Sequence, residues 1–126
     1  MYLIDTDVLI WVLRGNKDYQ DYLQNLKNRG SLSISTITIA EIYKNIFPAE
    51  MVKTEKLIAE MQSWDVTESI AKQGGLYWQQ FSKELKNLNL TDCLIAGTAY
   101  INSLILVTLN VKHFPMQDIR LENPFI

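Results

Sequence analysis

The opening stretch of the chain constrains the fold more than any other. Residues 2–4 form a short apolar run that ends at Asp5, as in a buried strand. A second apolar run over residues 8–13 is too long to continue that strand, and Gly15 follows it, so we expect a helix capped by Asp5 or Thr6. A strand that passes directly into a helix is typical of a parallel α/β sheet. Because ligands of such sheets bind beyond the carboxyl ends of the strands, Asp5 is predicted to lie at a functional edge.

Later segments alternate between helical and extended patterns. We expect helices over residues 18–29, 35–47, 49–64, 68–85 and 91–101, and short strands over residues 32–34, 64–67, 103–108 and 119–122. Gly74 and Gly75 are expected to bend the helix that contains them or to divide it into two pieces. The pattern predicts one α/β domain spanning residues 1–126, with a sheet that contains parallel strands.

Composition narrows the class of protein. The chain has 126 residues, enough for one core without disulfides or metals to hold it together. Its formal charge of -2 argues against tight non-specific binding to nucleic acid, so a polyanionic partner would need local positive charge or metal ions. Cys93 is the only cysteine, which favours a reducing compartment and hence the cytoplasm. The acidic N-terminus does not resemble a secretion signal, and no stretch has the ~18 apolar residues of a membrane helix.

Three carboxylates occupy equivalent places in this pattern. Asp5, Glu41 and Asp92 each lie where a strand passes into a helix or in the first turns of that helix. Each also has a purely structural explanation. Asp5 can cap its helix, Asp92 can complement the helix dipole, and Glu41 can form a capping box with Thr38.

The joint placement of the three acids points to chemistry. In a doubly wound sheet all three reach the same edge, where like charges ~4 Å apart repel by about 4 kcal/mol per pair at an effective dielectric of 20. No matching trio of Lys or Arg lies beside them in the sequence. The expected counter-charge is therefore a hard divalent cation, Mg²⁺ or Mn²⁺, which prefers oxygen ligands. Such an ion can activate water and neutralise charge on a phosphate, the chemistry of phosphodiester hydrolysis.

Four motifs in order carry a resemblance to a known family. They are Asp-Thr-Asp-Val-Leu-Ile at 5–10, Thr-Ile-Ala-Glu-Ile-Tyr at 38–43, Thr-Asp-Cys-Leu-Ile-Ala at 91–96 and Leu-Val-Thr-Leu-Asn-Val-Lys-His-Phe at 106–114. The chain resembles PIN-domain ribonucleases, and most closely the toxin subunit of VapBC toxin-antitoxin pairs. The resemblance implies a three-layer α/β/α fold around a central, mainly parallel five-stranded sheet. It also implies metal-dependent endoribonuclease activity on RNA, a homodimer, and neutralisation by a cognate VapB-like antitoxin that covers the active site.

The resemblance also assigns roles to single residues. Asp5, Glu41 and Asp92 would be the catalytic, metal-binding acids, with Asp5 and Asp92 as direct ligands and Glu41 binding directly or through water. Thr6 would orient Asp5 or a bound water, and Thr108 would support the site. These roles rest on the likeness of the motifs.

Two positions depart from the family pattern. The fourth acidic position falls at Asn110, whose amide carries no charge and would hold a second metal more weakly. Asp7 stands where Asn is commoner, and its expected role is that of a helix-start acid. Lys44 is expected to pair with Glu41 along its helix. The other cations that could contact phosphates, although each fits a solvated surface role, are Arg14, Lys17, Lys112 and His113.

Two other classes of function stay open. A receiver-like signalling domain would use Asp5 and Asp7 as its acidic pair, but it needs a phosphorylatable Asp at the end of its third strand. Asp65 is expected to begin the nearest strand, which counts against that class. A catalytically inactive PIN module that only binds protein is compatible with the amide at Asn110.

Overall fold

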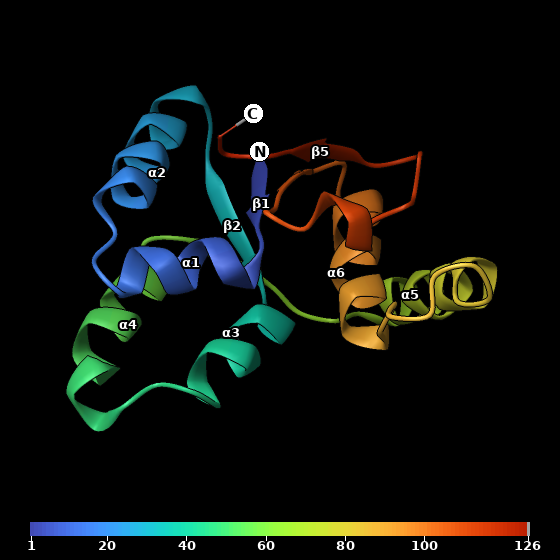
Figure 1. Cartoon of the computed structure of the whole chain (residues 1–126), viewed down its shortest axis with the longest axis horizontal. Helices are drawn as coiled ribbons and strands as arrows, with labels where there is room; N and C mark the ends of the chain where they lie inside the picture. The colour runs from blue at the N-terminus through green and yellow to red at the C-terminus, as the bar shows by residue number, and fades with distance from the viewer. Residues whose placement is uncertain (126) are drawn as a thin grey trace.

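The computed structural model describes residues 1–125 and contains a five-stranded sheet at its centre (Figure 1). The order of the strands is β3-β2-β1-β4-β5, and every neighbouring pair is parallel. The predicted α/β fold with a five-stranded, mainly parallel sheet is thereby confirmed. The strands are β1 (Tyr2–Ile4), β2 (Leu32–Ser35), β3 (Gln62–Trp64), β4 (Ile105–Val107) and β5 (Arg120–Glu122).

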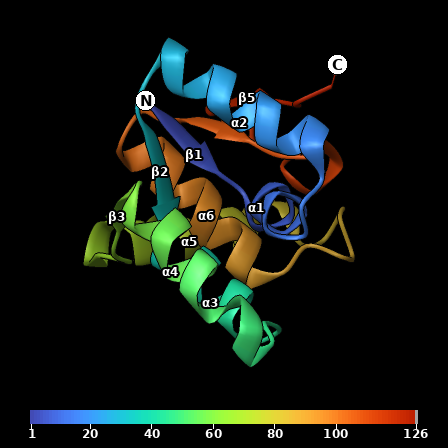
Figure 2. The same ribbon diagram turned by 90° about the vertical axis from the view of Figure 1, so that its left-hand side faces the viewer.

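Helices cover both faces of the sheet. They are α1 (Thr6–Leu13), α2 (Lys17–Arg29), α3 (Thr36–Tyr43), α4 (Met51–Ala59), α5 (Glu68–Phe81) and α6 (Leu90–Ile101), with 3-10 turns η1 (Pro48–Glu50) and η2 (Val111–His113). Figures 1 and 2 show α1, α2 and α4 on one side and α5 and α6 on the other. None of the helices within residues 1–125 is long and apolar enough to cross a membrane.

Alternation of side chains along the strands divides the core into two. Ile4 and Val107 pack with α1 and α2 on one face, whereas Leu3 and Leu106 pack with α5 and α6 on the other. Successive strand residues point to opposite faces, and both faces are buried, so β1 is apolar throughout. This arrangement is the three-layer α/β/α architecture that the sequence predicts.

The direction in which successive strands are added to the sheet reverses beside β1. After β1 the chain adds β2 and then β3 on one side, and it returns later to place β4 and β5 on the other side. Parallel sheets bind ligands at such a switch point, beyond the carboxyl ends of the strands. Asp5 and Thr108 directly follow the two strands that flank it, and the Asp5 N–H donates to the Val107 carbonyl at 2.9 Å.

The third strand lies earlier than the sequence indicated. It covers residues 62–64 rather than 64–67, the helix expected over 49–64 ends at Ala59, and the helix expected over 35–47 ends at Tyr43. β3 is an edge strand with an exposed Gln62 and Ser63, so it carries no apolar alternation that could mark it.

The new position of β3 also changes the comparison with a receiver domain. Asp65 directly follows the strand, so the expectation that it begins the strand was wrong. The receiver-like alternative is nevertheless contradicted by the strand order. Flavodoxin-like receivers place their third strand beside the first, whereas here β2 separates β3 from β1.

Helix α5 is one continuous helix from Glu68 to Phe81, so the expectation of two pieces at Gly74 and Gly75 was wrong. A Cβ at Gly74 would lie 2.7 Å from the side chain of Leu94 and 3.2 Å from its Cα, while a Cβ at Gly75 would meet nothing within 4 Å. Gly74 therefore serves the close approach of α5 to α6.

Candidate active site

A polar cleft of about 230 Å³ opens at the carboxyl ends of β1 and β4. Its lining is mostly charged and amide side chains. The acids are Asp5, Asp7, Glu41 and Asp92, the amides are Asn45, Asn89 and Asn110, and the basic side chains are Lys44 and His113. The three acids predicted from sequence thus meet in one cleft, although they come from the end of β1, from α3 and from α6. Asn45 and Asn89 were not singled out by the sequence.

Asp5 is the most buried of these acids, with 6% of its surface exposed. It caps α1, where its Oδ1 accepts the Thr6 N–H at 2.9 Å, and its Oδ2 accepts the Thr108 hydroxyl at 2.8 Å. Burial raises the pKa of Asp5 to about 6, and the charges of Asp7 and Asp92 push that pKa in the same direction. Both carboxylate oxygens of Asp5 are therefore fixed in position, and keeping the buried carboxylate charged costs free energy.

Glu41, on α3, is held by a side chain of α1. The Thr6 hydroxyl donates to Glu41 Oε1 at 2.6 Å and lies 3.3 Å from the Thr38 hydroxyl. The capping box that Thr38 and Glu41 could form is wrong, because α3 begins at Thr36 and its cap is Ser35, three residues before Thr38; the Ser35 hydroxyl accepts the Ile37 N–H. Thr6 touches Asp5 only through its backbone; its side chain positions Glu41.

Asp92 lies in the first turn of α6, behind the cap residue Asn89. The Asn89 side chain accepts the Asp92 N–H at 2.8 Å. Burial raises the pKa of Asp92, the facing His113 lowers it, and Glu41 and Asp7 raise it further. His113 Nδ1 is 3.8 Å from Asp92 Oδ2. The sequence signal for Asn89 was its place three residues before Asp92, which is the spacing of a helix cap.

Asn110 connects two of the motifs. Its side-chain amide donates to Asp7 Oδ2 at 2.5 Å, and its backbone N–H donates to the Thr108 hydroxyl at 3.0 Å. Thr108 in turn donates to Asp5, so the segment after β4 holds the acids that follow β1. The amide at position 110 thus neutralises none of the cleft's negative charge, but it orients Asp7.

The basic side chains are divided between the cleft and the surface around it. Lys44 lines the cleft, and among the ion pairs within residues 1–125 it has none with Glu41, so the expected intrahelical pair is wrong. His113 also lines the cleft, whereas Arg14 lines a neighbouring groove and Lys112 is exposed.

The donors in the cleft suit a hard cation. They are oxygen ligands. The pKa of Asp5 and of Asp92 is raised mainly by burial and further by neighbouring carboxylates, as expected for partly buried acids that repel one another. Within residues 1–125 no group of three or more His, Cys, Asp or Glu side chains is arranged to hold a metal ion by itself. An open set of this kind fits Mg²⁺, which commonly takes one or two carboxylates and fills its other positions with water and phosphate oxygens.

A model of the PIN domain family matches residues 2–115. This chain belongs to the PIN domain family. Among curated relatives, Ribonuclease VapC10 of Mycobacterium tuberculosis is 38% identical to this PIN domain over 125 residues, which cover 99% of the chain and 93% of the relative. Ribonuclease VapC19 of the same organism is 32% identical over 117 residues, with 92% and 94% covered. The resemblance carried by the four motifs is thereby confirmed.

Solved structures agree with the fold of this PIN domain. VapBC2 from Rickettsia felis, bound to a DNA fragment from its promoter, superposes with a TM-score of 0.84 at 21% identity and covers 97% of both chains. DNA-bound VapBC from Salmonella typhimurium gives a TM-score of 0.82 at 26% identity, with 98% of this chain and 97% of the other covered. Both structures are toxin-antitoxin complexes, and both share the α/β/α arrangement.

Proposed function

We propose that this PIN domain is a metal-dependent endoribonuclease that hydrolyses RNA phosphodiester bonds and acts in the cytoplasm as the toxin of a type II toxin-antitoxin pair. The observation that carries the proposal is the meeting of Asp5, Glu41 and Asp92 in one cleft at the switch point of the sheet. The ribonuclease names of relatives up to 38% identical support it.

The three acids of the cleft and the two threonines that hold them have separate parts in the proposed reaction. Asp5 and Asp92 would hold Mg²⁺ or Mn²⁺ directly, and Glu41 would hold it directly or through water. The bound ion would supply an activated water and neutralise charge on the phosphate. Thr108 and the Thr6 N–H keep Asp5 oriented, and the Thr6 hydroxyl fixes Glu41 toward the cleft. These contacts pre-organise the oxygen donors before substrate arrives.

The cleft also contains groups suited to the RNA itself. Lys44 and His113 lie at its lining, where an ammonium and an imidazole N–H can contact a phosphate oxygen. With a formal charge of -2 the whole chain attracts a polyanion weakly. Positive charge for the substrate would therefore be supplied at the cleft by Lys44 and the metal.

An apolar groove beside the cleft is suited to the antitoxin. It is lined by Ile10, Leu13, Arg14, Ile42, Asn45, Ile46, Phe47 and Glu50, and it shares Ile10 and Asn45 with the cleft. Phe47 is 71% exposed, so its ring is open to an apolar partner at the edge of the groove. We assign the groove to an apolar segment of a VapB-like antitoxin, which would thereby reach over the acids. A homodimer is part of the same proposal.

The proposal is tested with purified protein and RNA. Cleavage is expected with Mg²⁺ or Mn²⁺, and EDTA should stop it. Asp92→Asn should abolish cleavage, because one ligand is lost, whereas the control Asp65→Asn changes an exposed acid beyond the edge strand and should cleave normally. Cleavage that persists under chelation, or an Asp92→Asn protein as active as its parent, would refute the mechanism. A parent that cleaves no RNA but binds its antitoxin would favour the inactive PIN module.

A further inference from the structure

Three aromatic rings form a connected row on the surface, which we call the aromatic ladder: Trp11, Tyr19 and Phe125. Trp11 and Tyr19 are stacked with ring centroids 5.8 Å apart and planes 20° apart, and Phe125 meets Tyr19 edge-on at 4.8 Å. Tyr19 is half-buried, while Trp11 and Phe125 are 40% and 51% exposed. The ladder thus presents two open rings whose positions are fixed by a third.

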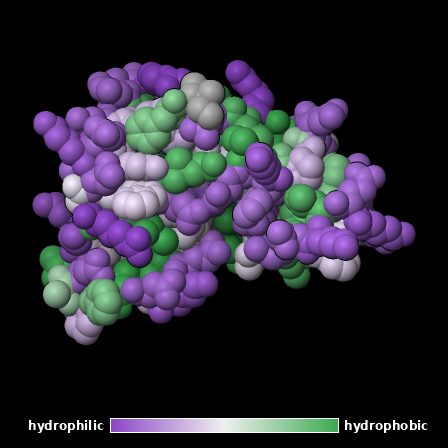
Figure 3. Space-filling view, in the orientation of Figure 1, coloured by the Kyte–Doolittle hydropathy of each residue, from purple (hydrophilic) through white to green (hydrophobic). Residues whose placement is uncertain are grey.

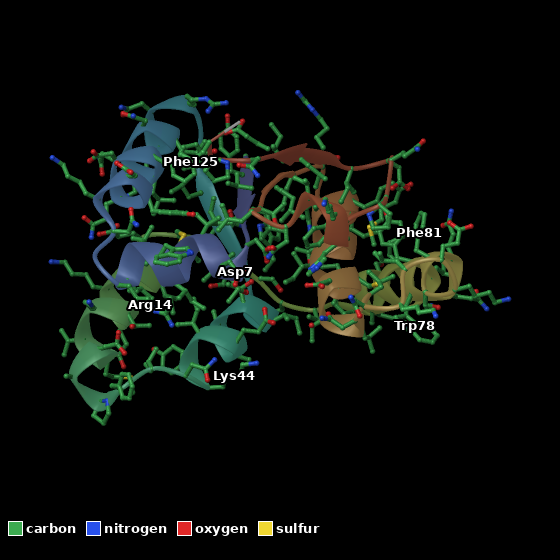
Figure 4. The ribbon with its side chains drawn as sticks, in the orientation of Figure 1. Asp7, Arg14, Lys44, Trp78, Phe81 and Phe125 are labelled. Carbon is green, nitrogen blue, oxygen red and sulfur yellow. The ribbon has the colours of Figure 1, made fainter. Side chains whose placement is uncertain are left out.

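The ladder begins beside the catalytic cleft. Asp7, Trp11 and Arg14 are all exposed and follow one another along α1 at spacings of four and three residues, so they share one stripe of the helix. The helical rise places Trp11 only ~6 Å along the axis from Asp7, which lines the cleft. Figure 4 shows Asp7 near the start of α1, Arg14 at the other end of that helix, and Phe125 above the helix.

Positive charge accompanies these rings. The Arg14 guanidinium carbon lies 5.8 Å from the centroid of the Trp11 ring, and Lys17 follows at the start of α2. Neither cation forms an ion pair with another of residues 1–125. Figure 3 shows a pale patch of intermediate hydropathy over α1 and α2, bordered by hydrophilic side chains.

We infer that the aromatic ladder is a stacking track for single-stranded RNA beside the cleft, with Arg14 and Lys17 contacting the phosphates. The inference rests on the proposed function and names the form of its substrate. Single strands bind where aromatic faces alternate with cations, because bases stack on rings and phosphates pair with positive charge. An apolar peptide fits the groove near Phe47 better, since half of that groove's lining side chains are aliphatic, although Arg14 lines the groove and also lies over Trp11 of the ladder.

Because the rings are already fixed, stacking of a base on them costs little side-chain entropy. Trp11 is held by Tyr19 on the protein, so little side-chain freedom is lost when a base stacks. A guanidinium stacks on aromatic faces and pairs with phosphate at the same time, so Arg14 can keep its place over Trp11 while it binds RNA. A duplex offers no unstacked base to the ladder. The track therefore selects unpaired nucleotides next to the bond that is cut.

The test measures binding separately from cleavage. A fluorescently labelled single-stranded RNA is titrated with the full chain carrying Asp92→Asn, in the presence of Mg²⁺, and anisotropy is recorded. On this background Trp11→Ala should weaken binding roughly tenfold, the loss expected for one stacked base, and Phe125→Ala should also weaken it. Trp11→Tyr should retain most of the affinity, because a face for stacking is kept. The matched control is Trp78→Ala, since Trp78 is 46% exposed on α5, far from α1 in Figure 4.

The outcomes separate this inference from the proposed function. Unchanged affinity in Trp11→Ala, an equal loss in Trp78→Ala, or an equal loss for duplex RNA of the same sequence would overturn the track. Normal RNA binding by Trp11→Ala with lost neutralisation by the antitoxin would also overturn it, because the ring would then serve a protein partner. A parent with Asp92 intact that fails to cleave RNA would refute the proposed function instead. Thermal unfolding of each variant identifies any loss that comes from misfolding.

Discussion

Replacing Asp5 with Asn is expected to make the metal-free protein more stable while destroying its activity. Asp5 is 6% exposed, and burial raises its pKa from 3.8 to about 6. The folded state therefore holds its proton between these two pH values, where the unfolded state has already released it. Because the unfolded chain binds fewer protons there, stability falls as pH rises from about 4 to 6 and then stays low.

The magnitude follows from the same two values. A difference of about two pH units corresponds to about 3 kcal/mol at neutral pH, since each unit is worth about 1.4 kcal/mol. Asn keeps the acceptor for the Thr6 N–H, and its amide can donate to the Thr108 hydroxyl in place of accepting from it. Asp5→Asn should thus recover much of this free energy at pH 7 and little of it at pH 4.

Thermal unfolding in EDTA across this pH range measures the effect. A gain of about 3 kcal/mol corresponds to roughly 10 °C in Tm for a chain of this size. Added Mn²⁺ should narrow the difference, because the ion stabilises only the protein that retains the carboxylate. Equal Tm values at pH 7, or a difference that does not change with pH, would show that the buried charge on Asp5 is not destabilising and would refute the reasoning.

Other substitutions test single contacts of the structure. Asn110→Asp places a second carboxylate against Asp7 in place of the amide that donates to it; it should lower Tm without metal and tighten Mn²⁺ binding in calorimetry, and weaker Mn²⁺ binding would contradict this. Thr6→Val removes the hydroxyl that fixes the acid on α3; kcat should fall about tenfold with an intact fold, equivalent to about 1.4 kcal/mol, and unchanged kcat would exclude a positioning role. Gly74→Ala should lower the free energy of unfolding by about 1 to 3 kcal/mol in urea because its Cβ has no room. The control Gly75→Ala meets open space and should be neutral or stabilising.

The N-terminal stretch of the sequence was enough to predict at which edge of the sheet the site lies. The apolar run before Asp5 marks β1, and the helix after it fixes the edge at which the acid lies. The strand before Thr108 was predicted in the same way, because central strands of parallel sheets are apolar on both faces. Apolar patterns in the sequence therefore sufficed to predict the strands that are buried on both faces.

Contacts between distant segments were beyond such patterns. Glu41 fits a capping box by its spacing, yet its partner is Thr6, 35 residues earlier, and only the packing of α1 on α3 reveals the pairing. β3 was misplaced because an exposed edge strand needs no apolar alternation. The amide of Asn110 reaches Asp7 across 103 residues, a contact that neither motif contains.

The bond between Thr108 and Asp5 joins residues 103 positions apart. A ribosome making this chain has therefore synthesised most of it before the Thr108 hydroxyl can reach Asp5. A polypeptide stopped midway would carry Asp5 and Glu41 but neither Asp92 nor the Thr108 hydroxyl that orients Asp5, so the proposed site would be incomplete. Under the proposed function, cleavage of RNA would therefore begin only after Thr108 has been synthesised and has folded against Asp5.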